Sequence, residues 1–101
     1  MNANNTELMD FYDFLGMPLY TPKAIKTLDA NKEEYEISYL VPLETNDNQT
    51  VKKLINAIKS KQRFKLYDRY LKPTLKIKIL KIQAVPELQN VFSVTVFAVP
   101  L

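Results

Sequence analysis

The chain has 101 residues, 47% of them hydrophobic, and a formal net charge of +3 at pH 7. These values predict one globular domain over residues 1–101 and leave too few residues for a second core. The sequence holds no apolar run long enough to span a membrane, and its first ten residues have neither the basic nor the apolar region of a signal peptide. We therefore expect a cytoplasmic protein without a membrane partner.

The absence or scarcity of some residue types excludes several kinds of functional site. The chain has no His and no Cys, and its one glycine is Gly16. Phosphate-binding loops need several glycines, and His is the commonest general base and metal ligand. The acidic residues within 33–36 and the pair Asp10 and Asp13 could hold a hard cation or act as acid and base, but both groups fit exposed faces better. We expect a binding protein rather than an enzyme, with no catalytic residue, metal or cofactor.

The first third of the chain predicts a short helix and an ambiguous segment. Asn5 or Thr6 is a candidate N-cap for the helix, and Gly16 suits the position just after its last residue. Residues 22–28 fit either a one-turn helix or a short edge strand, and we favour the strand. Apolar residues recur at helical spacing at Leu8, Phe11, Tyr12 and Leu15.

The middle of the chain predicts a strand and a second helix. A strand should end at Pro42, because Tyr35, Ile37, Tyr39 and Val41 alternate with other residues before it. A loop over 44–49 follows, with Asp47 or Asn48 as the helix cap. The apolar stripe of this helix comprises Val51, Leu54, Ile55 and Ile58, and its opposite face carries Lys52, Asn56 and Lys59.

Three more strands are predicted, near Arg63–Leu71, Leu75–Ala84 and Asn90–Val99. The elements together indicate an α+β domain, in which an antiparallel sheet of four to five strands is backed by two helices. A small OB-like barrel is the alternative fold. Such barrels usually need glycines at their corners, and this chain has one.

Charge is distributed very unevenly along the chain. Residues 1–50 contain nine acidic residues and three lysines, for a charge of −6, whereas residues 51–82 contain eleven basic residues and one acid, for a charge of +10. The last nineteen residues carry −1. A cationic block of this kind attracts polyanions.

The predicted hairpin within the cationic block places most of its charge on one face. A two-residue turn at Pro73-Thr74 would pair Arg69 with Lys78 and Tyr70 with Ile77, and it would bring the apolar rows of both strands to the other face. Phosphates could then be neutralised on the basic face and a base could stack on an exposed tyrosine. The candidate nucleic-acid contacts are Lys52, Lys59, Arg63, Lys65, Tyr67, Arg69, Lys76 and Lys78.

The favoured hypothesis is a non-enzymatic protein that binds the phosphate backbone of nucleic acid, with single-stranded DNA or RNA preferred. Alternatively, the basic face binds no ligand, and its lysines serve only to keep an edge strand soluble. A further alternative is a protein-binding module or inhibitor, for instance a mobile-element accessory protein, that docks on an acidic partner. Strand Asn90–Val99 is apolar on both faces. We expect either residues 17–28 or a second copy of this strand, in a homodimer, to cover it.

Overall fold

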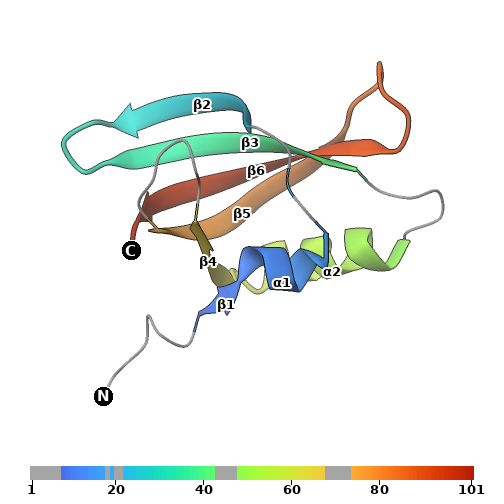
Figure 1. Ribbon diagram of the computed structural model, residues 1–101, viewed down its shortest axis with the longest axis horizontal. Coiled ribbons are helices and arrows are strands. Elements are labelled where there is room, and N and C mark those ends of the chain that lie inside the picture. The colour runs from blue at the N-terminus through green and yellow to red at the C-terminus, as the bar shows by residue number, and fades with distance from the viewer. Residues whose placement is uncertain (1–7, 18, 20–21, 43–47, 68–73) are drawn as a thin grey trace.

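The computed structural model describes residues 8–17, 19, 22–42, 48–67 and 74–101, and these form an α+β fold (Figure 1). One sheet of six strands has the order β1-β4-β5-β6-β3-β2. In chain order the elements are β1 (Met9–Asp10), α1 (Phe11–Leu15), β2 (Pro22–Asp29), β3 (Glu34–Pro42), α2 (Asn48–Lys59), β4 (Arg63–Tyr67), β5 (Thr74–Ala84) and β6 (Val91–Pro100).

The α+β prediction is confirmed, with two differences in the sheet. The described strands number six rather than four or five, and the sheet is mixed because β1 pairs in parallel with β4 while every other neighbouring pair is antiparallel. The sheet ends in β1 on one side and β2 on the other, so it is open and does not form the OB-like barrel. Residues 22–28 form a strand as predicted.

The first helix is shorter than predicted, because Asp10 caps it. The Asp10 carboxylate accepts hydrogen bonds from the backbone N–H groups of Tyr12 and the next residue, at 2.8 and 3.3 Å. Asn5 and Thr6, the predicted caps, lie outside the described residues. Gly16 follows the helix with φ 72°, as predicted, and its N–H donates to the carbonyl of Tyr12 at 2.8 Å.

Helix α2 begins at Asn48, a predicted cap that is instead the first helical residue. Of the predicted stripe, Leu54 is buried and Val51 and Ile58 pack partly buried against the core, whereas Ile55 is 37% exposed. Thr50 and Ala57, outside the predicted stripe, are also buried. The predicted stripe is therefore right at three of its four positions, and the helix is rotated slightly so that Thr50 and Ala57 replace Ile55. Small Thr and Ala side chains face the core because α2 packs directly on β5, where close approach favours them.

Both helices lie on one side of the sheet (Figure 1). The core between them and the sheet contains the alternate residues of β3, β4, β5 and β6 that point toward the helices. Phe64 of β4 packs against α1, with ring centroids 5.2 Å from Phe11 and 4.6 Å from Phe14. The other face of the sheet, called the open face below, carries neither described helix. In the described part of the chain, no helix has the length and apolarity needed to cross a membrane.

The register of β4 against β5 differs from the predicted one. Arg63, not Arg69, lies opposite Lys78, and Leu66 lies opposite Leu75. The predicted pairing, continued along both strands, would set Phe64 opposite polar Gln83, whereas the observed pairing sets it opposite a buried isoleucine. Burial therefore outweighed the local turn preference. Both registers have the same parity, so the prediction of one apolar and one basic face holds; residues 68–73 lie outside the described residues.

Candidate functional site

Two strands carry four cations in facing positions on the open face. Arg63 of β4 lies opposite Lys78 of β5, and Lys65 of β4 lies opposite Lys76 of β5. Their alternate neighbours are buried, which fixes these four side chains on the side away from the helices. None of the four has an ion-pair partner among the residues that the structure describes. Like charges opposed across a ladder destabilise it, so this arrangement carries an electrostatic cost.

A fifth cation, Lys81, reaches the same face through a bulge that the alternation did not predict. The register of β5 against β6 shifts between Ile79 and Lys81, with the exposed Leu80 in between. Lys81 consequently lies opposite Thr95, whose partner on β3 is also on the open face. Without the extra residue, Lys81 would point into the core like Ile79. A bulge leaves no trace in a periodic pattern, so the sequence alone did not select Lys81.

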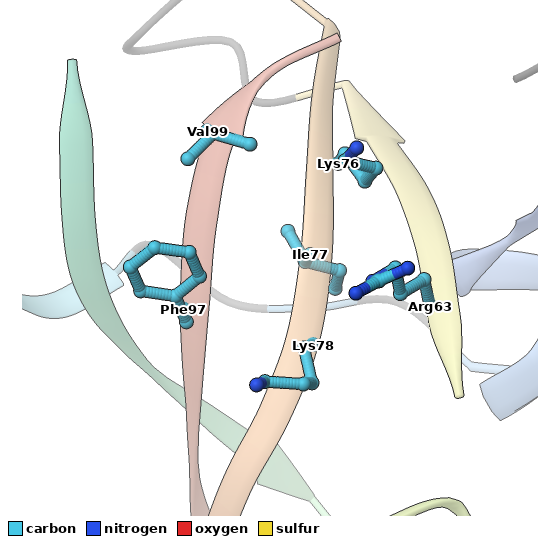
Figure 2. A pocket seen from close by; sticks show the side chains of 6 residues that line it. All are labelled: Arg63, Lys76, Ile77, Lys78, Phe97 and Val99. Atoms are coloured by element: carbon cyan, nitrogen blue, oxygen red, sulfur yellow. The ribbon is translucent and has the colours of Figure 1, made fainter. Parts of the chain in front are cut away.

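A hollow of about 240 Å³ lies over β4, β5 and β6, and three of the five cations line it. Figure 2 shows Lys78 extending from β5 toward β6, and Arg63 extending from β4 toward β5. Ile77 borders the hollow through its backbone, because its side chain is 1% exposed and belongs to the core. The residues that line the hollow are Arg63, Lys76, Ile77, Lys78, Phe97 and Val99.

Phe97 gives the hollow an aromatic wall, and the site prediction did not include it. Its side chain is half-buried on β6, directly opposite Lys78. Among the described residues its ring contacts no other ring. Both faces of β6 are apolar in sequence, so Phe97 is placed on the open face only by its pairing with Lys78 and by the burial of its neighbours Val96 and Ala98.

Beyond Phe97 the open face becomes polar and then acidic. Ser38 of β3 and Thr95 of β6 join their hydroxyl groups at 3.0 Å, which satisfies both. Glu36 of β3 lies opposite Phe97, on the side away from Lys78. The open face is therefore zoned: cations lie on β4 and β5, an aromatic ring on β6, a carboxylate on β3, and a single further cation, Lys26, opposite that carboxylate on β2.

Tyr67 lies on the basic face, as predicted, and it is the last residue of β4. It shares the open face with Arg63 and Lys65 by alternation along β4, and it is 51% exposed. The Tyr12 hydroxyl donates to the Tyr67 backbone carbonyl at 3.4 Å. This bond holds the backbone at Tyr67 and does not involve the Tyr67 ring.

The structure separates Lys52 and Lys59 from the other candidates. Both are exposed on the outer side of α2, across the helix layer from the open face. Lys53 has a structural contact: its Nζ donates to the Phe14 carbonyl at 2.9 Å and lies 5.2 Å from the centre of that ring. Arg69, the remaining candidate, lies outside the described residues.

The acidic residues do not gather into a site in the described part of the chain. Asp10 serves as the cap of α1. The described ranges contain no group of three or more carboxylates close enough together to hold a metal ion.

Strand β6 is not an edge strand, so the expectation that two copies of this strand pair along their backbones in a homodimer is wrong. It pairs with β5 on one side and with β3 on the other, so its backbone cannot add a further strand. Strand β2 does not cover it either, because β2 pairs with β3 at the edge of the sheet. The order of the strands in the sheet could not be predicted from the sequence, since side chains alternate between the two faces in the same way in an edge strand and in an interior strand.

No protein-family model, curated protein or solved structure matches this chain. Function is therefore inferred from the chemistry of the open face.

Proposed function

We propose that this protein binds single-stranded nucleic acid, DNA or RNA, on the open face of β4, β5 and β6. The observation that carries the proposal is the group of five cations without a described acidic partner: Arg63, Lys65, Lys76, Lys78 and Lys81. Cations two residues apart on a strand are spaced by about 6.6 Å. Such regular spacing suits a polymer with regularly repeated phosphates, which would relieve the repulsion between the facing cations.

An unpaired strand fits this face better than a duplex. Single-stranded nucleic acids bind to sheets that combine basic side chains with exposed aromatic rings, because every base has a face that can stack. Tyr67 and Phe97 provide such rings beside the cations. Reading of base edges in a duplex groove commonly uses a helix, whereas the longer described helix, α2, lies on the other side of the sheet.

The proposed activity is binding without catalysis, through phosphate neutralisation and stacking. It requires no metal or cofactor. The cytoplasm, where single-stranded RNA and transiently unpaired DNA occur, is the proposed location. The candidate contacts Lys52 and Lys59 do not belong to the proposed surface, since they lie on the far side of the helix layer.

The test is a salt series with labelled DNA and RNA strands of about 16 nucleotides, the upper end of usual site sizes, and a duplex of the same length. Five phosphate contacts at roughly −0.7 each predict a slope of about −3.5 for log K against log salt. Fluorescence anisotropy gives the constants. An absence of binding to every strand at low salt would exclude the proposal, and binding insensitive to salt would exclude its electrostatic mechanism.

Protein binding is the second candidate, because the same face combines charge with apolar surface. Phe97 and Val99 are partly exposed between cations and Glu36, a mixture that also occurs in protein interfaces. An acidic partner would dock on the cations. A homodimer that covers β6 would have to use this open face, since the backbone edges of β6 are occupied. Sedimentation over a concentration series without nucleic acid distinguishes a dimer from a monomer.

A further inference from the structure

We infer that the hollow beside Phe97 binds one unpaired base, with the phosphate chain confined to the β5 side of the ring. This inference rests on the proposed function. Beyond attraction between charges, it specifies where one base lies and on which side of it the phosphate chain runs. It is carried by the hollow, by the exposed side of the Phe97 ring and by the order of charges across the strands.

The charges are ordered along a single row of cross-strand neighbours. Lys78 lies opposite Phe97 on one side and Glu36 lies opposite it on the other, while Arg63 lies one strand beyond Lys78. Adjacent strands are about 4.8 Å apart, so the ring has cations on one flank and a carboxylate at a similar distance on the other. A nucleotide whose base lies on this ring meets two cations in succession on the β5 side, whereas on the β3 side it meets a carboxylate first and the single Lys26 one strand further.

The hollow suits a small group. Its volume of about 240 Å³ is smaller than the pockets of roughly 300 Å³ or more that enclose drug-sized ligands. One wall is apolar, from Phe97 and Val99, and the opposite wall is cationic, from Arg63, Lys76 and Lys78. A base that packs against the apolar wall places its phosphate at the cationic wall. The phosphate then contacts the cations, and the base contacts the Phe97 ring.

Glu36 would act as a barrier to the phosphate chain. Its side chain is half-buried, and it forms no ion pair among the described residues. Lys26 lies opposite it on β2, a single cation against the five on β4 and β5. Phosphates near Glu36 would be repelled, so the chain would follow β4 and β5 rather than cross β6.

The base contact is tested by comparing a thymidine strand with an abasic strand of the same length and phosphate number. The wild-type protein should prefer the thymidine strand by about fivefold to 150-fold, the effect of one stacked base. Phe97→Leu should abolish this preference and leave the salt slope and the abasic affinity unchanged, while Phe97→Tyr should keep it. Urea unfolding of each variant shows whether the fold is retained.

The outcomes separate the two proposals. If the wild-type protein binds neither strand at low salt, the proposed function fails and the base contact with it. If it binds both strands equally, or if folded Phe97→Leu retains the preference, the base contact alone is wrong.

The barrier is tested with Glu36→Gln and Glu87→Gln, which change the net charge equally. Glu87 is exposed in the turn between β5 and β6, away from the row that contains Phe97. Removing a like charge some 7 Å from a phosphate should tighten binding about threefold for Glu36→Gln. Glu87→Gln should have a smaller effect. Equal effects of the two substitutions on affinity would show that Glu36 does not direct the phosphate chain.

Discussion

Individual residues adopt backbone conformations that glycine would adopt more easily. Glu33, Lys61 and Asn90 have φ values of 55, 56 and 58°, in the left-handed region. Lys61 follows α2, and its N–H donates to the Ile58 carbonyl at 3.1 Å. The next N–H, of Gln62, donates to a carbonyl five residues earlier at 3.0 Å, which completes a Schellman cap.

Lys61→Gly is predicted to stabilise the protein by about 0.5–1 kcal/mol, because a left-handed residue with a Cβ costs roughly 1–2 kcal/mol and the flexibility of glycine offsets part of the gain. Urea denaturation measures the free energy of unfolding. Lys59→Gly removes the same charge two residues earlier, at the last residue of α2, and should instead destabilise the protein, by up to about 1 kcal/mol. A loss of stability in Lys61→Gly would contradict this account of the cap.

Tyr67 provides a second prediction at the scale of a residue. Its exposure indicates that Tyr67→Ala should change the free energy of unfolding by no more than about 0.5 kcal/mol. Binding of single-stranded DNA should weaken by roughly 1–3 kcal/mol if a base stacks on the ring, and Tyr67→Phe should bind almost normally. Anisotropy titrations measure the binding. Equal losses of stability and affinity would mean that the ring is structural.

Among the elements, the two helices are joined by one side chain. Lys53 of α2 contacts both the ring and the carbonyl of Phe14, near the end of α1. The sequence suggested only that lysines on α2 enlarge the basic surface. It could not assign Lys53 a partner, because which side of α2 meets α1 depends on how both helices pack on the sheet.

Lys53→Met should destabilise the protein by about 0.5–1 kcal/mol, the combined size of an exposed cation–π contact and a charged hydrogen bond that water can partly replace. Lys52→Met removes the same charge on the outer side of α2, where no described contact depends on it, and should be nearly neutral. Thermal or urea unfolding of both variants measures the difference. Equal stabilities would show that the contact contributes nothing.

The sequence predicted the long strands better than the short elements. Strands β3, β5 and β6 begin and end within a residue of the predicted ranges, because each alternates over many residues. Strand β1 has two residues, too few for any period. The capping role of Asp10 and the bulge before Lys81 were missed for the same reason, since each depends on a single local geometry.

In the whole molecule, the cations concentrated in the second half of the chain gather on one part of the open face of the sheet. Parity alone predicted that Arg63, Lys65, Lys76 and Lys78 would share a face, and they do. The sequence could not show that Lys52 and Lys59 lie on the far side of the helices from the open face. Helical periodicity does not indicate which face of a sheet the helix covers. The placement of Phe97 needed the order of the strands.

The central claim, that the open face is the binding surface, is tested most directly by two double substitutions with the same change in net charge. Lys76→Glu with Lys78→Glu reverses two cations on the open face, and Lys52→Glu with Lys59→Glu reverses two on the outer side of α2. The open-face variant should bind single-stranded DNA at least about tenfold more weakly, with a salt slope smaller by about 1.4. The helix variant should retain its salt slope and lose no more than about threefold in affinity, from the weakened overall field. Equal losses in the two variants, or a larger loss in the helix variant, would contradict the claim.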